Sequence, residues 1–260
     1  MDAQWGGGAP RTYNKNLSIL RDFFKFLILR GHLHGDPTLA IERARSRQVY
    51  RTTFTTDQRR AIIAQSADRH DRIALRLLLD YALRKSALRA VQFTHFDRQR
   101  KRLTIFTKGQ KVREVAIPDS AFWMDLERLI LDLGAQSTHY LIPSPPRAMP
   151  VGKPDEQGHR RVELRHFPDK PTSGASLHRW WYARPAEAGI VPEGTSSGER
   201  MHKARHTAGQ RVLDATGGNL KAVQKLLGHS SIQSTGDIYA DWDIDQLAAT
   251  MADVLAEDDA

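Results

Sequence analysis

Five short motifs along the chain contain residue types that can act on a phosphate group. They are YALRKSAL at 81–88, TKGQK at 107–111, HKARH at 202–206, LLGHSSI at 226–232 and STGDIY at 234–239. A guanidinium can bind two phosphate oxygens at once and keeps its positive charge. Histidine and lysine can move protons, and a tyrosine phenol becomes a nucleophile once a base takes its proton. Together these residue types indicate phosphoryl transfer without a metal ion.

The composition argues against other kinds of catalytic site. The chain has no cysteine, which excludes disulfides, cysteine zinc sites, iron–sulfur clusters and a cysteine nucleophile. It has no Walker-type glycine-rich loop and no carboxylate cluster of the two-metal nuclease kind. His202 and His206 have the i, i+4 spacing of metal ligands, but no third ligand stands near them in the sequence. We therefore expect no metal and no other cofactor.

The charge of the chain indicates a polyanionic partner. The 260 residues carry a net charge of +9, divided into +13 over 1–120, +3 over 121–240 and −7 over 241–260. A single charge run is most often a solvated helix face, but half a chain this basic is typical of a nucleic-acid binder. The sequence shows no apolar run of transmembrane length and no secretory signal, so we expect a cytoplasmic protein without a membrane partner.

Hydrophobic periodicity predicts a mainly α protein with a small three-stranded antiparallel sheet, an α+β class. The predicted helices cover 12–30, 54–67, 71–89, 120–134, 175–188, 201–215, 219–227 and 243–256. Alternating β-rich segments at 91–97, 102–109 and 111–118 predict the sheet, with a tight turn at 108–110. Residues 143–173, rich in proline, glycine and charge, are expected to form a loop or a small excursion.

The order of the five motifs resembles that of the tyrosine recombinases, also called phage-type integrases. That family has an arginine, a hairpin lysine, His-x-x-Arg, Gly-His and a C-terminal tyrosine, and the resemblance covers residues 12–257. The resemblance implies a partial core-binding (SAM-like) helical DNA-binding domain and linker at 11–50, and a catalytic domain at 51–260. Residues 1–10 are glycine-rich, and we expect them to be disordered. The implied activity is site-specific DNA recombination, in integration or excision, by an enzyme of a phage or mobile element.

The resemblance implies that Arg84 and Arg205 bind the two non-bridging oxygens of the scissile phosphate. Both would stabilise the charge that develops there in the transition state. His229 would add a hydrogen bond to the same phosphate. Without the other motifs, Arg84 would be interpreted as an ordinary exposed helix arginine.

Proton transfer is expected to depend on three further residues. Tyr239 would be the nucleophile and would form a 3′-phosphotyrosyl link, with His202 as general base or phosphate ligand. Lys108 in the hairpin turn would protonate the leaving 5′ oxygen, and Lys111 is the alternative for that role. A packed aromatic is the alternative for Tyr239, whereas Tyr50, Tyr140 and Tyr182 do not stand in matching motifs.

DNA contacts are expected from the basic linker and from lysines beside the catalytic motifs. The residues are Arg43, Arg45, Arg47, Arg51, Lys85 and Lys111. The Trp180–Trp181 pair is expected in the core or in an interface and not as a platform for base stacking. His206 is expected to be buried and structural.

The last segment, 243–257, has an apolar stripe and an acidic opposite face. An acidic face does not suit DNA, so we expect a helix that docks into a neighbouring copy within a tetrameric synapse. Packing within its own chain is the alternative.

Two departures from the family pattern leave rival functions open. Ala87 stands where the family often has a supporting acid, and only about 50 residues precede the catalytic region, about half of the usual four-helix domain. The first rival is a truncated DNA-binding remnant that does not recombine. The second is a nicking-closing enzyme like the type IB topoisomerases.

Overall fold

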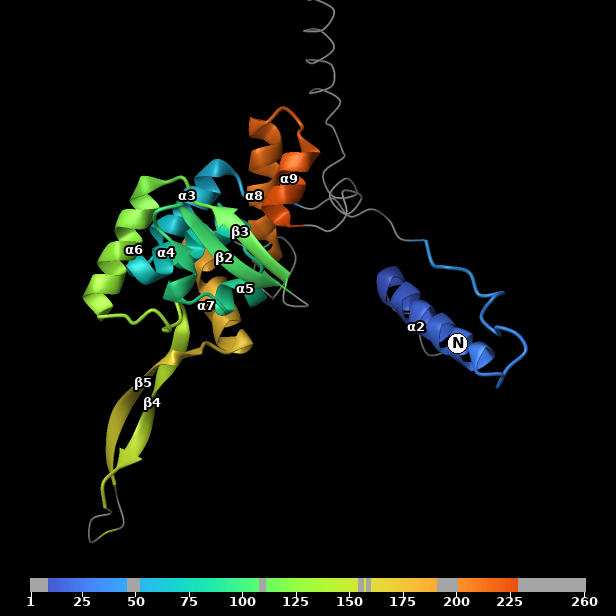
Figure 1. Ribbon diagram of the computed structural model, residues 1–260, viewed down its shortest axis with the longest axis horizontal. Helices are drawn as coiled ribbons and strands as arrows, with labels where there is room; N and C mark the ends of the chain where they lie inside the picture. The colour runs from blue at the N-terminus through green and yellow to red at the C-terminus, as the bar shows by residue number, and fades with distance from the viewer. Residues whose placement is uncertain are drawn as a thin grey trace, which may run out of the picture. The chain divides into compact units, whose positions relative to one another are not determined.

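Figure 1 shows the computed structural model of the protein. The structure describes residues 9–45, 52–107, 111–153, 157, 160–190 and 201–228. By its internal contacts the chain divides into two compact units, Met1–Tyr50 and Arg51–Ala260. Each unit is described by itself below.

The described part of the first unit consists of one helix and the segment that follows it. Helix α2 (Pro10–Leu29) confirms the helix predicted over 12–30, and Gly31 lies just beyond its end with a φ of +74°. The side-chain amide of Asn14 donates to the carbonyl of Ala44, and the N–H of Ala44 donates back to the Asn14 side-chain oxygen, both at 2.8 Å. The segment after the helix therefore runs back along it.

The core of the second unit is built around helix α4 (Arg69–Leu79). This helix packs against α3 (Thr56–Ala64), α6 (Ser120–Leu133) and α8 (Met201–Ala215), and α7 (Gly174–Glu187) packs against α3. Its buried residues are Ile73, Ala74, Leu75, Leu77, Leu78 and Leu79. The predicted helices over 54–67, 120–134, 175–188 and 201–215 correspond to α3, α6, α7 and α8, and the mainly α class is confirmed.

The single helix predicted over 71–89 was wrong, because the structure divides it. Helix α4 ends at Leu79, and a separate short helix, α5 (Lys85–Arg89), begins after Arg84. Between them Ala82 has a φ of +55°, a left-handed conformation that no helix interior contains. The apolar pattern continues through this break, so periodicity did not reveal it. The break turns Arg84 away from a helix interior and places it at a helix start.

Asp80 holds the break between α4 and α5 in place. Its carboxylate pairs with Arg59 from α3, with Arg76 at 3.4 Å and with Arg211 from α8 at 3.0 Å. The Asp80 side chain is only 11% exposed, so these three arginines offset the cost of burying its charge. One carboxylate thus joins three helices next to the predicted catalytic arginine.

The three-stranded antiparallel sheet is confirmed, with strand order β1-β2-β3. Its strands are β1 (Phe96–Asp97), β2 (Arg102–Thr107) and β3 (Lys111–Ala116). Within the strand expected over 91–97, three residues form a 3-10 turn, η1 (Phe93–His95), and only the last two residues pair with β2. The predicted turn at 108–110 lies outside the described residues.

Of the two alternatives for 143–173, a loop or a small excursion, the plain loop was wrong, because strands β4 (Pro143–Val151) and β5 (Arg161–Pro171) pair into a second, two-stranded sheet. This hairpin extends from the body of the second unit (Figure 1). Most of its residues are exposed, so the sequence lacks the alternation of apolar and polar residues that would predict the strands. Its prolines are tolerated because both strands of a two-stranded sheet are edges.

Helix α9 (Leu220–Leu227) confirms the helix predicted over 219–227 and packs side by side with α8 (Figure 1). It ends at Gly228, whose φ is +60°. The predicted helix over 243–256 lies outside the described residues. Within the described part of the chain, no helix is both long enough and apolar enough to span a membrane.

Candidate active site

Arg84 occupies the position before the first turn of α5. Its backbone is extended, with φ −74° and ψ 150°, and its side chain is half-buried. Ala87 and Leu88 anchor the short helix in the core behind it. Arg84 therefore lies at the start of a helix that is anchored in the core. This position suits a residue whose guanidinium must bind a ligand in a fixed orientation.

Arg205 is buried in α8 and is only 4% exposed. Its Nη1 donates to the carbonyl of Ala82, and its Nη2 donates to the carbonyl of Leu227 at the end of α9. Carbonyls at a helix C-terminus carry partial negative charge and lack partners in their own helix. The guanidinium of Arg205 gives the carbonyls of Ala82 and Leu227 a hydrogen-bond partner. Its position and orientation are therefore fixed before any ligand binds.

One cavity of about 320 Å³ brings the described catalytic candidates together. It is lined by Leu83, Arg84, Lys85, His178, Tyr182, Met201, His202 and Arg205. Arg84, His202 and Arg205 come from two motifs far apart in the sequence, and each was singled out as a catalytic candidate. Lys85, predicted to contact DNA, lines the same cavity. His202 is exposed, so its imidazole is accessible to a ligand that enters from solvent.

His178 and Tyr182 line this cavity although sequence reasoning did not select them. The Nζ of Lys85 and the Nε2 of His178 are 2.9 Å apart, and the rings of His178 and Tyr182 have centroids 5.5 Å apart. The only sequence signal is their i, i+4 spacing on α7, which puts both on one helix face. Nothing in that spacing shows that the face is turned toward Arg84.

Arg113 on β3 is a further cation, half-buried and near Arg84. Its Nη2 donates to the carbonyl of Leu226 in α9. Burial, reinforced by the nearby positive charge of Arg84, lowers the pKa of Arg113 to about 10. The guanidinium still carries its charge at neutral pH. No motif marked this residue, because its partners are far away in sequence.

Several predicted residues fall elsewhere. Lys108, His229, Tyr239, Arg47 and Arg51 lie outside the described residues. Arg43 and Arg45 are exposed in the first unit. Lys111 is the first residue of β3. His206 is half-buried rather than fully buried, and Trp181 is fully buried in the core as expected.

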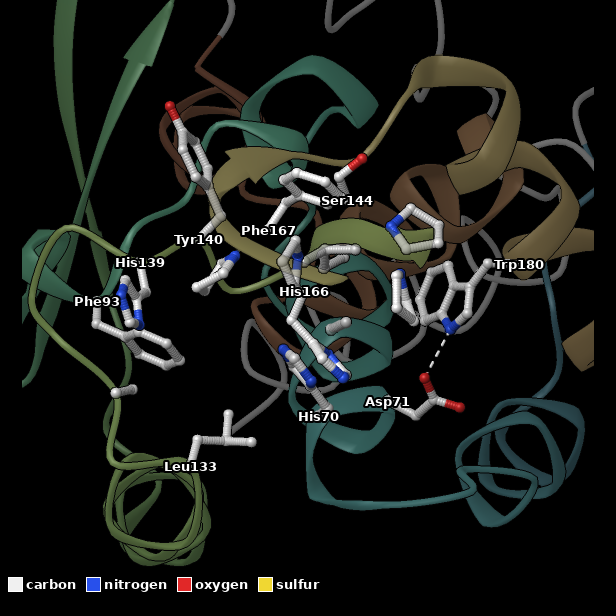
Figure 2. A pocket seen from close by; sticks show the side chains of 17 residues that line it. His70, Asp71, Phe93, Leu133, His139, Tyr140, Ser144, His166, Phe167 and Trp180 are labelled. Carbon is white, nitrogen blue, oxygen red and sulfur yellow. Dashed lines mark hydrogen bonds between the residues drawn. The ribbon is translucent and has the colours of Figure 1, made fainter. Parts of the chain in front are cut away.

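A second cavity, of about 510 Å³, lies at the base of the β4–β5 hairpin (Figure 2). His70, Tyr140, Phe167 and Trp180 line it, and Trp180 donates from its indole N–H to Asp71 at 2.7 Å. None of the described catalytic candidates, Arg84, His202 and Arg205, lines this larger cavity. Among the residues that the structure describes, no group of three histidines or acids could hold a metal ion.

Comparison with known proteins gives a family. Residues 52–245 match the model of the phage integrase family. The chain is 27% identical over 241 residues to the tyrosine recombinase XerC of Vibrio parahaemolyticus and 28% identical over 238 residues to that of Serratia marcescens. Each match covers 89% of the chain, and the chain spans about two thirds of each relative, 67% and 69%.

Solved structures share the fold. The crystal structure of XerA recombinase matches with a TM-score of 0.55 at 19% identity, covering 94% of this chain and 77% of that one. The Tn1549 transposon integrase in complex with circular intermediate DNA matches with a TM-score of 0.61 at 17% identity, covering 97% and 82%. A lambda integrase dimer bound to a core site matches with a TM-score of 0.58 at 20% identity, covering 88% and 74%.

Proposed function

Because this chain belongs to the phage integrase family and is a tyrosine recombinase, an enzyme of site-specific DNA recombination, we propose how its own residues cleave and rejoin DNA. The observation that carries the proposal is the cavity that gathers Arg84, His202 and Arg205. Two guanidiniums and an accessible imidazole around one small cavity form a binding site for a phosphodiester.

Arg84 and Arg205 bind the non-bridging oxygens of the scissile phosphate. Arg205 is held in place by its bonds to Ala82 and Leu227, and Arg84 by the start of α5. Because both groups are positioned in advance, they stabilise charge on the phosphate without reorganising during the reaction. The positive charge of Lys85 in the same cavity adds to the attraction for the DNA backbone.

Tyr239 supplies the nucleophile in this proposal. Its phenolic oxygen attacks phosphorus, the bond from phosphorus to the 5′ oxygen breaks, and a 3′-phosphotyrosyl link forms. His202 accepts the phenolic proton or binds the phosphate, Lys108 donates a proton to the leaving 5′ oxygen, and His229 donates a hydrogen bond to the phosphate. Attack of a 5′ hydroxyl on the link reverses these steps, so religation needs no ATP.

The substrate is proposed to be double-stranded DNA, and the active assembly a tetrameric synapse. Supporting structures with this fold are a lambda integrase dimer bound to a core site and a lambda integrase tetramer bound to a Holliday junction. In the synapse the segment 243–257 docks into the neighbouring copy. The other DNA contacts are Arg43, Arg45, Arg47, Arg51, Lys85 and Lys111. A cytoplasmic location, where DNA is accessible, belongs to the same proposal.

A suicide-substrate assay tests the reaction. Nicked duplexes that tile the DNA flanking the gene are incubated with the protein, and a covalent adduct is sought on a denaturing gel. The wild type and Tyr182→Phe should form the adduct, and Tyr239→Phe should not. Tyr182 is the matched control, because its phenol lines the cavity yet is not the proposed nucleophile.

Other outcomes select the rival functions. DNA binding without any adduct supports the non-recombining remnant. Relaxation of a supercoiled plasmid without strand exchange between two duplexes supports the enzyme like a type IB topoisomerase. An adduct that persists in Tyr239→Phe and disappears in Tyr182→Phe contradicts the assignment of the nucleophile.

A further inference from the structure

Arg113 connects the small sheet to the end of helix α9. It lies on β3 opposite Ile105 of β2, and its side chain leaves the sheet to donate from Nη2 to the carbonyl of Leu226. Leu226 is in the last turn of α9, where carbonyls have no partner within the helix. A cation is favoured there by the helix dipole as well as by the hydrogen bond.

Gly228, which follows α9, is shaped to receive this side chain. A Cβ built at Gly228 would lie 2.8 Å from both the Cδ and the Nη1 of Arg113. The backbone of Gly228 also has a φ of +60°, which side chains disfavour. The stem and the guanidinium of Arg113 therefore pack directly on the backbone that leaves α9.

Arg205 binds the next carbonyl of the same helix end, that of Leu227. Two arginines from different elements, β3 and α8, thus hold successive carbonyls of the last turn of α9. Arg84 is close enough for its charge to lower the pKa of Arg113. The end of α9 is therefore held by Arg113 and by Arg205, one of the two arginines that line the proposed phosphate site.

We propose that Arg113 is a positioning residue for strand cleavage, because it fixes the end of α9 to the β2–β3 hairpin. This inference rests on the proposed function. His229 follows Gly228 directly in sequence, and Lys108 follows Thr107, the last residue of β2. One side chain thereby couples the chain segments that lead to Lys108, the proposed proton donor, and to His229, the proposed hydrogen-bond donor to the phosphate. Arg113 itself touches neither substrate nor reacting atoms in this proposal.

The test compares Arg113→Ala and Arg113→Lys with Arg102→Ala. Arg102 is the matched control, because it is an arginine on the neighbouring strand that pairs with Glu114 at the surface. Single-turnover adduct formation is measured at saturating nicked DNA, and DNA affinity is measured separately. Arg113→Ala should slow cleavage about 10- to 100-fold, the range expected when a reacting group is displaced by an ångström or less.

Affinity should change less than about threefold for Arg113→Ala, because Arg113 bonds to the protein and not to DNA. Arg113→Lys should recover part of the rate, since an ammonium can still donate to the Leu226 carbonyl. Arg102→Ala should cleave at the wild-type rate. A wild-type cleavage rate in Arg113→Ala overturns the proposal, and so does a loss confined to DNA affinity.

Gly228→Ala supplies a second variant that acts on the same contact. It should slow cleavage in the wild-type background and have a smaller effect in the Arg113→Ala background, because the close contact is then gone. Equal effects in both backgrounds would show that the two residues act independently, and would overturn the coupling.

Hydrogen exchange separates this inference from the proposed function. Amides in peptides covering 220–228 should exchange faster in Arg113→Ala than in the wild type and in Arg102→Ala. If the wild type forms no adduct, the proposed chemistry fails, and the contact is judged by exchange alone. Unchanged exchange in Arg113→Ala then shows that Arg113 does not hold the end of α9.

Discussion

The Nη1 of Arg205 donates a hydrogen bond to the carbonyl oxygen of Ala82, a residue held in the left-handed region at a φ of +55°. Ala82 lies in the break between α4 and α5 and is fully buried. The bond therefore ties a catalytic candidate from α8 to the strained link that orients Arg84. The two arginines of the site are positioned by one local structure.

Replacing Arg205 should cost both activity and stability. Arg205→Ala leaves the buried carbonyls of Ala82 and Leu227 without their partner, so the free energy of unfolding should fall by about 2–4 kcal/mol. Adduct formation should fall at least about 100-fold. Urea unfolding and the suicide-substrate assay measure the two effects.

Arg84→Ala is the contrasting variant. It should lose adduct formation to a similar degree, but its free energy of unfolding should change by less than about 1 kcal/mol because Arg84 is half-buried. Equal losses of stability in the two variants would contradict the inference that Arg205, unlike Arg84, stabilises the fold through its bonds to buried carbonyls.

Ala82 should tolerate glycine but not valine. Ala82→Gly relieves a backbone strain of about 1–2 kcal/mol and loses a buried methyl worth about 0.8 kcal/mol, so the stability should stay within about 1 kcal/mol of the wild type. Ala82→Val adds a β-branched side chain in the same conformation and should cost more than about 2 kcal/mol. Thermal and urea unfolding test both variants, and a large loss in Ala82→Gly would show that the left-handed φ carries no strain.

His70 should make the protein less stable in mild acid. Its pKa is lowered from the ordinary value mainly by burial, and its Nε2–H donates to the carbonyl of Leu141. The unfolded state therefore binds a proton at a higher pH than the folded state. The free energy of unfolding should fall as the pH drops below about 6.5, toward the lowered pKa of the folded state.

His70→Gln should flatten this dependence on pH. Urea unfolding measures the free energy of unfolding of each protein at pH 7.5 and at pH 5.5. His34→Gln, at an exposed histidine of the first unit, should leave the wild-type difference unchanged. If the free energy of unfolding changes equally with pH in His70→Gln and in the wild type, His70 does not cause the loss of stability in mild acid.

Chelation should not affect cleavage. The positive charge that a metal ion would place at the phosphate is supplied by Arg84 and Arg205 in the proposed site. Adduct formation in excess EDTA should therefore match that in buffer alone. A strong inhibition that added Mg²⁺ reverses would contradict the proposed mechanism.

The motifs could be recognised in the sequence because their order along the chain is a local, readable property. Arg84, His202 and Arg205 were selected in this way, and the cavity contains all three. Helices such as α6 and α9 were predicted because their apolar residues recur at the spacing of one helix face. The roles of Lys108, His229 and Tyr239 stay predictions from the sequence.

The tertiary structure decided what depends on contacts between distant segments. The break at Ala82 is held by Arg205 and by the arginines around Asp80, none of which alters the apolar pattern of 71–89. His178 lines the cavity, and Arg113 bonds to the end of α9, only because distant segments fold together. A motif shows which residues can do chemistry. The partners of those residues depend on how distant segments pack in space, and the local spacing of residues does not reveal that packing.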